Sequence, residues 1–302
     1  MSRRLLMVAA GLAVDRVLGE PHRVPHPVAL FGKVMGGVEQ RWYAPAMLNG
    51  TAYAAIGVAL GGLCGVVVGS PLMATYVAVA GRSLADTAQS VLDALESGDL
   101  ERARFLLPGL VGRDPSGLDE VEVSRAVVES VAENTVDAVI APALWALAGG
   151  APGALGYRAV NTMDAMVGHR SERYRRFGTT AARLDDVANW VPARLTALLV
   201  AVARPRQAFQ VWQTVRSDAP AHPSPNSGVA EAAFAAALGI RLGGESQYGE
   251  LTETRPQLGT GRAAKPTDIR AAIRLSQDCT LVLGAVLLVC SVAFSTRFRT
   301  RT

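Results

Sequence analysis

The chain has 302 residues, of which 50% are hydrophobic and 19% are charged, and its formal net charge is +4. This composition excludes an intrinsically disordered chain, and the 26 acidic residues nearly balance the 30 basic ones, which leaves no strongly basic domain for nucleic acid. A membrane protein with no nucleic-acid partner is therefore the first hypothesis.

The first apolar segment follows two arginines. Residues 5–14 come after Arg3 and Arg4, as in the charged and apolar regions of a signal peptide. Asp15 and Arg16 stand where such a peptide would need a small-residue cleavage site. The segment is therefore predicted to be a retained anchor or a short membrane helix.

Residues 42–81 contain no charged side chain, a stretch too long for a single crossing of about 20 residues. A break is predicted near Gly69 and Pro71, because glycine and proline interrupt helices. Arg41 and Arg82 bracket the two resulting segments. The positive-inside rule then predicts a hairpin with both ends in the cytoplasm.

Polar segments with helical periodicity come next. The spacing of Leu84, Val91, Leu92 and Leu95 predicts an amphipathic helix within residues 83–101, and residues 118–137 have a similar pattern. We therefore expect a layer of amphipathic cytoplasmic helices beside the membrane.

Two further apolar stretches are interrupted. Residues 138–157 are uncharged but are split by glycines and a proline at 149–153, so two half-helices, a re-entrant hairpin and a full span all remain open. Residues 187–203 are apolar apart from Arg194. Because an intramembrane arginine is costly unless it is paired or faces water, this segment is either shallow or presents Arg194 to a site.

The last apolar stretch, residues 279–296, precedes three arginines and predicts a spanning helix with a cytoplasmic basic anchor. The three cysteines lie in apolar stretches without metal-ligand spacing, so no zinc site is expected.

The predicted fold is an all-α polytopic integral membrane protein with broken or re-entrant helices. We treat residues 1–302 as one integrated membrane domain with polar helical segments at about 82–137 and 204–278.

Three carboxylates recur every four residues before the broken stretch. Glu129, Glu133 and Asp137 would share one face of a helix, where they repel one another. A solvated face is the simpler interpretation. The stripe leads directly into an apolar segment, however, where desolvation would raise carboxylate pKa values or recruit a metal ion, and this location favours a functional cluster.

Acids, amides and arginines also gather in two later segments. The first contains Arg158, Asn161 and Asp164, and the second contains the adjacent pair Asp185 and Asp186. An aspartate pair suits magnesium, although helix capping is an alternative. The arginines could bind phosphate in bidentate fashion or could be ordinary juxtamembrane charge.

Two proline-rich loops complete the set of candidate site segments. One runs from Gly19 to Val28 and includes His26, and the other runs from His222 to Gly228 and precedes Glu231. Such turns either fix side chains at a site or simply connect helices. No Walker A, GxGxxG, GxSxG or HExxH motif occurs.

In order and spacing these blocks resemble the CobD/CbiB family, the membrane-bound adenosylcobinamide-phosphate synthases of cobalamin biosynthesis, over about residues 10–276. The resemblance rests on Gly19-Glu20-Pro21 with residues 25–28, residues 111–114, residues 129–134 with Asp137, residues 157–164, Phe177-Gly178, residues 185–189, residues 192–194 and Ser224-Pro225-Asn226. The chain departs from the family pattern at Glu20, where aspartate is expected, and at Val229-Ala230, where tryptophan and proline are frequent.

The resemblance implies an ATP-dependent ligase that joins adenosylcobyric acid to (R)-1-amino-2-propanol phosphate, or a related amino alcohol, with Mg²⁺ as cofactor and the corrinoid as substrate. On this basis catalytic roles go to Glu129, Glu133, Asp137 and Asp164; substrate or phosphate binding goes to His26, Asn134, Arg158, Asn161, Arg194 and Asn226; and magnesium binding goes to Asp185 and Asp186. Which acid is the base and which binds metal stays open.

The same resemblance implies a multi-pass protein of the inner cell membrane with its active site on the cytoplasmic side, where ATP is available. It leaves open a homo-oligomer or a complex with other cobalamin-assembly membrane enzymes.

Two alternative functions remain. Broken helices and Arg194 would also suit a transporter for an anionic solute, and an AmpE-like membrane regulator would use a related scaffold without the chemistry.

Overall fold

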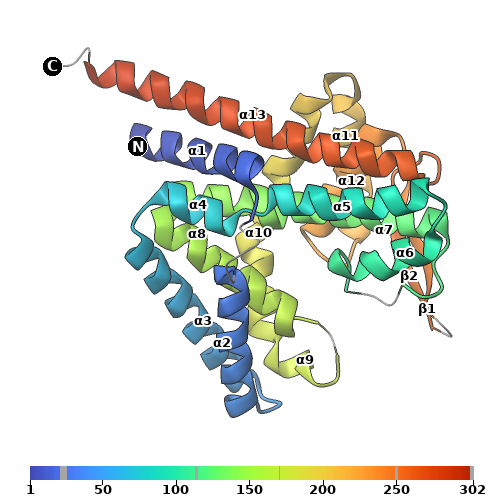
Figure 1. The fold of residues 1–302 in the computed structure, drawn as a ribbon, viewed down its shortest axis with the longest axis horizontal. Coiled ribbons are helices and arrows are strands. Elements are labelled where there is room, and N and C mark those ends of the chain that lie inside the picture. Colours follow the sequence, from blue (N-terminus) through green and yellow to red (C-terminus); the bar gives the residue numbers. More distant parts are fainter. Residues whose placement is uncertain (21–25, 113–114, 170, 249–250, 300–302) are drawn as a thin grey trace. The chain divides into compact units, whose positions relative to one another are not determined.

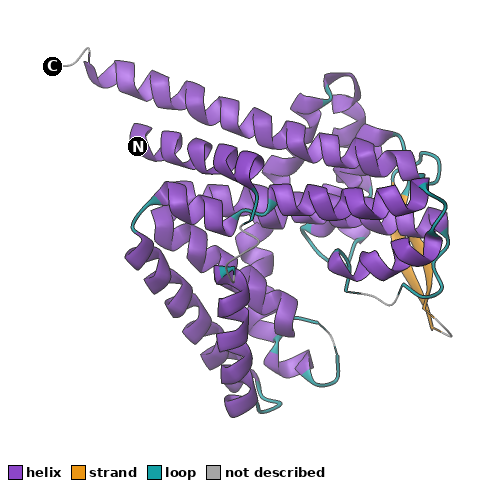
Figure 2. Cartoon of the chain, in the orientation of Figure 1, coloured by secondary structure: helices purple, strands orange, loops and turns teal. Residues whose placement is uncertain are grey.

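The computed structural model of the chain describes residues 1–20, 26–112, 115–169, 171–248 and 251–299. Almost every element is a helix, and the strands of the described chain form a single hairpin (Figure 2). The elements are α1 Ser2–Leu18, α2 Pro27–Trp42, α3 Met47–Val68, α4 Pro71–Ala78, α5 Gly81–Glu96, α6 Leu100–Leu106, η1 Leu107–Gly109, α7 Glu120–Thr135, η2 Val136–Ile140, α8 Ala141–Val167, α9 Tyr174–Phe177, α10 Thr179–Ala203, η3 Pro205–Gln207, α11 Ala208–Ser217, η4 Ala219–Ala221, α12 Ser227–Leu238, β1 Leu242–Tyr248, β2 Leu251–Leu258 and α13 Pro266–Arg299.

Four segments of the described chain are long and apolar enough to cross a membrane. They are α3, the continuous stretch Glu120–Val167, α10, and Pro266–Thr296 of α13. The prediction of an all-α polytopic membrane protein is therefore confirmed. Among the residues of the predicted segments, Pro21, Pro25, Arg113, Asp114 and Arg301 lie outside the described residues.

The contacts divide the chain into two compact units. Unit 1 comprises Met1–Ala80, Asp137–Asn189 and Leu283–Thr302, and unit 2 comprises Gly81–Val136 and Trp190–Val282. The polar segments expected at 82–137 and 204–278 fall in unit 2, except for Asp137. That the whole chain acts as one integrated domain stays a prediction.

The break predicted near Gly69 is confirmed. Gly69 ends α3 with a φ of 63°, and the Ser70 hydroxyl accepts a hydrogen bond from Met73 N at the start of α4. The spanning hairpin expected between Arg41 and Arg82 is wrong. With eight residues, α4 is about 12 Å long and cannot cross a hydrocarbon layer of roughly 30 Å.

Small residues bring the helices of unit 1 into close contact. Along α3, Gly61 and Gly65 are buried against α8, and a Cβ on either would collide with the backbone of that helix, at Leu155 and at Pro152. The two helices run side by side in Figure 1. Such backbone approach is typical of packing between apolar membrane helices, where small residues replace bulky ones at the interface.

The stretch after Asp137 turns back on itself. Within α8, Gly150 has φ 65° and ψ −147°, and Arg4 Nη1 donates to the carbonyls of Leu147 and Ala148 at 3.1 and 3.0 Å. Beyond this turn, Tyr157 Oη donates to Asp137 O at 3.1 Å, although a straight helix would separate residues 20 apart by about 30 Å. Residues 138–157 are therefore not one straight helix but two helical parts that fold back at Gly150, and whether they are re-entrant in a membrane stays a prediction.

The helices of unit 2 differ in how they are buried. As predicted, α5 is amphipathic and buries Leu84, Val91, Leu92 and Leu95. The similar prediction for α7 is wrong, because Val123, Ala126–Ala132 and Thr135 are buried around most of its circumference. This helix is a central element of unit 2, and Asp119 and Glu122 begin it with a reciprocal capping box.

A hairpin interrupts the segment expected to be helical at 204–278. Strands β1 and β2 pair antiparallel from Leu242 opposite Leu258 to Tyr248 opposite Leu251, with an irregularity between Leu242 and Gly244. Gly243 and Gly244 have φ values of 69° and 89°, which other residues rarely adopt. The glycine pair therefore produces the bulge that begins the hairpin.

Candidate active site

The predicted site residues fall into two groups. Those of unit 1 are His26, Asp137, Arg158, Asn161, Asp164, Asp185 and Asp186, and those of unit 2 are Glu129, Glu133, Asn134, Arg194 and Asn226. The acidic stripe is interrupted at this boundary. The α-helical register ends at Thr135, and Asp137 lies in the π-helical turn η2, so a simple four-residue repeat does not place it with Glu129 and Glu133.

In unit 1, one amide joins two carboxylates. Asn161 Nδ2 donates to Asp137 Oδ2 and to Asp185 Oδ1, both at 3.3 Å. The three residues come from η2, α8 and α10. The re-entrant turn in α8 is what returns Asn161 to Asp137, so a polar cluster forms where the sequence alone places apolar helices.

Two further polar groups complete this cluster. Asn189 Nδ2 donates to Asp185 Oδ2 at 2.9 Å, and Tyr157 Oη lies 2.8 Å from Asn189 Oδ1. Asn189 is 1% exposed and Asp185 is 9% exposed. Asn189 stands four residues after Asp185 on α10, and that spacing could have identified it as a partner, whereas nothing in the sequence connects Tyr157 to it.

Arg158 extends the cluster toward the first proline-rich loop. Its Nη1 donates to Asn161 Oδ1 at 3.3 Å, and its buried Nε has no hydrogen-bond partner within the described chain. His26 caps α2 by accepting from Val28 N. Burial lowers the pKa of His26, with Glu20 acting to raise it and Arg158 to lower it further. Arg158 therefore has a free donor for an anionic group.

Two pockets of unit 1 border the cluster. One of about 70 Å³ contains Arg158 and Thr162 among apolar side chains that include Phe31. The other, of about 310 Å³, is lined by Tyr157 and Trp145 together with apolar and glycine residues of α3, α8 and α10. Both are largely apolar with few polar groups, the usual character of a small-molecule site.

Two predicted acids of unit 1 lie beside this cluster. Asp164 is one turn beyond Asn161 on α8, and its carboxylate lies so close to Gly168 that a Cβ there would collide with it. Asp186 directly follows Asp185 on α10, and consecutive helical residues point about 100° apart. Only Asp185 of the aspartate pair is shown to bond Asn161.

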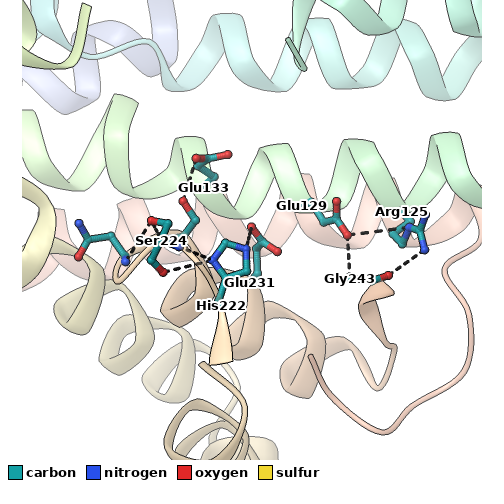
Figure 3. Close-up of polar contacts among 9 residues, drawn as sticks. Arg125, Glu129, Glu133, His222, Ser224, Glu231 and Gly243 are labelled. Carbon is teal, nitrogen blue, oxygen red and sulfur yellow. Dashed lines mark hydrogen bonds and ion pairs between the residues drawn. The ribbon is translucent and has the colours of Figure 1, made fainter. Parts of the chain in front are cut away.

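In unit 2, Glu129 holds the hairpin. Gly243 N donates to Glu129 Oε1 at 2.8 Å, and Arg125 donates from Nη1 to Gly243 O at 2.8 Å while its Nε lies 3.9 Å from Glu129 Oε1 (Figure 3). Glu129 is 4% exposed. The solvated face considered for the stripe is therefore wrong for this residue, whose carboxylate is engaged with the bulge of β1.

Glu133, one turn along α7, has a different environment. It is exposed, and Ser227 Oγ donates to its Oε1 at 2.8 Å. The neighbouring Asn134 turns back to its own helix, where Nδ2 donates to Ser130 O at 2.9 Å. Glu133 is thus oriented by one hydroxyl and still open to another ligand, whereas Asn134 is bound locally.

Arg194 is fixed by contacts within unit 2. Its Nη1 donates to Asn226 Oδ1 at 3.2 Å and to Trp190 O at 3.0 Å, and its Cζ lies 4.3 Å from the centre of the Trp190 ring. Asn226 is buried. Arg194 is therefore paired with a residue of the second predicted loop, and whether it faces a site stays a prediction.

Three residues of that loop and of α12 were missed as site candidates. His222 and Glu231 are both buried, and His222 Nε2 lies 3.8 Å from Glu231 Oε1. Burial is the main cause that lowers the pKa of His222. Ser227, adjacent to Asn226, reaches Glu133. The histidine-proline-rich loop was the available signal, but the sequence does not show which of its side chains turn inward.

Comparison with known proteins assigns these residues to a family. The sequence profile described as CobD/CbiB protein matches residues 8–276. The chain is 45% identical to the cobalamin biosynthesis protein CobD of Mycobacterium tuberculosis strain H37Rv, with 97% of each chain covered. The chain belongs to the CobD/CbiB family. Two other proteins of that name, from Geobacter metallireducens and Brucella anthropi, are 42% and 39% identical, over 93% and 97% of this chain and 96% and 98% of theirs.

Family membership confirms the predicted resemblance and a place in cobalamin biosynthesis. The matched region of this CobD/CbiB protein includes both groups of site residues. No solved structure matches the chain. The roles of individual residues therefore depend on the geometry described above.

Proposed function

We propose that this CobD/CbiB protein is an ATP-dependent ligase that forms an amide between adenosylcobyric acid and (R)-1-amino-2-propanol phosphate, or a related amino alcohol phosphate, and so produces adenosylcobinamide phosphate. The observation that carries the proposal is the Asn161 amide, which holds the carboxylates of Asp137 and Asp185 together. Two carboxylates kept together beside an apolar segment have a cost that a cation would offset.

The reaction needs activation because a carboxylate and an ammonium ion do not condense in water. A corrinoid carboxylate oxygen would attack the γ-phosphorus of ATP, with ADP leaving, to give an acyl phosphate. The amine would then lose a proton and attack the acyl carbon, and phosphate would leave. Catalysis of such steps is mostly positioning and charge stabilisation, which suits fixed carboxylates, amides and arginines.

The donors of the unit 1 cluster fit magnesium. Mg²⁺ prefers oxygen ligands and is usually held by one or two carboxylates, with waters and substrate phosphates completing its shell. Asp137 and Asp185 would hold the ion, and Asn161 and Asn189 orient Asp185. A metal-binding role for Asp186 stays a prediction. Within the described residues no group of three histidine, cysteine or acidic side chains could hold a metal ion, so the proposed site depends on substrate phosphates and water in addition to its two carboxylates. When bound, Mg²⁺ would neutralise charge on the phosphates.

Arg158 is proposed to bind a phosphate of ATP. Its Nη1 is fixed by Asn161, and its Nε is free to donate to an anion. Arginine suits this role because its guanidinium remains charged and presents several donors in one plane. His26, whose pKa is lowered by burial and by the charge of Arg158, would stand beside the same group.

The amino alcohol phosphate is assigned to residues of unit 2. Its ammonium group would bind the exposed carboxylate of Glu133, which would then accept the proton that the amine loses. Its phosphate would bind Arg194, which Asn226 and Trp190 hold in place. Glu129 is engaged with the hairpin, so the proposal gives acid–base work to Glu133; a catalytic part for Glu129 or Asp164 stays a prediction.

The four apolar segments support a membrane location, and we place the active site on the cytoplasmic side because the proposed reaction uses ATP. The decisive experiment uses purified protein in lipid nanodiscs with adenosylcobyric acid, the amino alcohol phosphate, ATP and Mg²⁺. We expect an amide product, detected by mass spectrometry, together with ADP and phosphate, and no product when any one component is omitted. Movement of an anionic solute across vesicles without ATP turnover would instead support the transporter alternative.

A further inference from the structure

The second proline-rich loop is organised around a buried histidine. His222 Nδ1 lies 3.1 Å from Ser224 N and 3.2 Å from Ser224 O, so either tautomer of the ring can bond the Ser224 backbone. The side chain is 5% exposed. A buried ring tied to the backbone two residues ahead fixes the direction in which the loop leaves α11 and η4.

The other edge of the ring is fixed by α12. His222 Nε2 lies 3.8 Å from Glu231 Oε1 and has no hydrogen-bond partner within the described chain. Gly228 lies against the ring so closely that a Cβ at that position would collide with His222. Charged groups from two other elements also act on the ring: Arg255 from β2, and Glu133 and Glu129 from α7.

Ser224 transmits the position of the histidine to the residues that follow. Its Oγ accepts hydrogen bonds from Asn226 N at 3.3 Å and from Ser227 N at 3.1 Å. Asn226 and Ser227 then meet the two groups assigned to the amino alcohol phosphate: Arg194 Nη1 donates to Asn226 Oδ1, and Ser227 Oγ donates to Glu133. The contacts of Asn226 with Arg194 and of Ser227 with Glu133 therefore depend on the turn that begins at Ser224.

We infer that His222 is a positioning residue for the amino alcohol phosphate: by holding Ser224, it keeps Asn226 on Arg194 and Ser227 on Glu133. This inference rests on the proposed ligation. His222 touches neither substrate, since its ring is buried among Ser224, Gly228 and Glu231. It acts on the distance and direction between the Glu133 carboxylate and the Arg194 guanidinium, which would bind the ammonium and phosphate ends of the amino alcohol phosphate.

The substitutions that test this separate the two ring nitrogens. In His222→Asn the side-chain amide lies where Nδ1 was and can still bond Ser224, whereas in His222→Gln the polar atoms lie further out, near the former Nε2. We expect His222→Gln to raise KM for the amino alcohol phosphate about tenfold, the effect of one lost hydrogen bond, and His222→Asn to remain within about threefold of wild type. KM for ATP and for the corrinoid acid should stay unchanged in both.

Two more variants keep the test decisive. Ser224→Ala removes the hydroxyl that bonds Asn226 and Ser227 but leaves the ring in place, so it should raise the same KM even if His222→Gln does not fold. Ser217→Ala, on the exposed surface of α11, is the control and should leave every constant unchanged. A merely structural role would lower the active fraction, and hence kcat, without changing the KM of one substrate selectively.

The outcomes for the two proposals differ. If the wild-type protein forms amide but His222→Gln and Ser224→Ala keep the wild-type KM for the amino alcohol phosphate, the positioning role is overturned and the ligase stands. The same holds if His222→Asn and His222→Gln are equally impaired. If the wild-type protein forms no amide from the complete mixture, the ligase proposal fails and the inference fails with it.

Discussion

The two polar clusters use their carboxylates in different ways. In unit 1, Asp137 and Asp185 share one amide, and the bonds join side chains from three separate elements. In unit 2, Glu129 and Glu133 are one turn apart on the same helix, yet the first is buried against a hairpin and the second is exposed. Equal spacing in sequence thus does not give equal chemistry, because each carboxylate takes its role from the element that packs across from it.

The two clusters also differ in what holds their carboxylates in position. The cluster of unit 1 is positioned by hydrogen bonds between side chains, which depend on the return of α8 at Gly150. In unit 2, the exposed carboxylate of Glu133 is positioned by the loop from His222 to Gly228, in which Ser224 accepts hydrogen bonds from the backbone of the residues that follow. Substitutions should therefore affect chemistry in unit 1, stability at Glu129, and substrate binding at Glu133.

The largest effect is expected for Asp185→Asn. This change removes a nearly buried carboxylate that bonds both Asn161 and Asn189, and it should lower the rate of amide formation about 100-fold or more. Asp186→Asn is the matched control at the neighbouring position, and it should lower the rate of amide formation less. Initial rates in nanodiscs with saturating substrates test this, and equal losses would show that the adjacent aspartates act as a pair.

Glu129→Gln should chiefly destabilise unit 2. The change removes the charge that faces Arg125 and weakens the bond from Gly243 N, at a cost of about 2 kcal/mol in the free energy of unfolding. Glu120→Gln, an exposed position at the start of the same helix, is the control and should cost less. Denaturant unfolding followed by tryptophan fluorescence measures both, and a stable Glu129→Gln protein without activity would restore a catalytic role to Glu129.

Glu133→Gln should weaken binding of the amine and leave stability nearly unchanged, because the side chain is exposed. Loss of the charge that faces the ammonium group should raise KM for the amino alcohol phosphate about tenfold, and loss of the proposed base should also lower the rate of amide formation. Steady-state kinetics with ATP and corrinoid held saturating give this value. An unchanged KM would assign the ammonium to another residue.

Gly150→Ala should destabilise unit 1 by about 1–3 kcal/mol, because φ 65° with ψ −147° is a conformation that is essentially restricted to glycine. Gly149→Ala, at the neighbouring position with open space around it, should be tolerated better. Thermal unfolding in detergent compares them. If the two variants melt alike, the turn at Gly150 does not control the return of α8.

The smallest effect concerns pH. Burial lowers the pKa of His222 below its ordinary value of 6.5, so the folded state binds fewer protons than the unfolded state below about that pH. Stability should therefore be complete above about pH 6.5 and decrease as the pH falls toward the folded pKa. The charged groups that face the ring are Glu129, Glu133, Glu231 and Arg255. They are present in both the wild-type protein and His222→Asn, so a difference between the two is assigned to the histidine. Denaturation curves between pH 7 and 5 should show a component that His222→Asn lacks.

Much of the fold follows from local rules. The break at Gly69, the amphipathic α5 and the long apolar α13 were all predicted, since hydrophobic periodicity and helix breakers act over a few residues. The spanning role of the segment after Pro71 and the amphipathic character of α7 were predicted wrongly. Composition cannot show where a helix stops or how many neighbours cover it.

The site was predicted in part for the same reason. Asp137, Asn161 and Asp185 were selected from their residue types and do meet, and Arg194 does reach Asn226. His222, Ser227 and Tyr157 were not selected, because these contacts are with residues between 9 and 94 positions away that no short motif connects. The prediction that all the acids serve one reaction is left to the kinetic experiments.

The sequence by itself determined that this protein is a helical membrane protein of the CobD/CbiB family, because apolar runs, breakers and motif order are properties of the chain. The tertiary structure decided which of its many acids are engaged and which are open. Periodicity sets the face on which a side chain stands, but only the packing of distant segments sets what that face meets, as the different surroundings of Glu129 and Glu133 demonstrate.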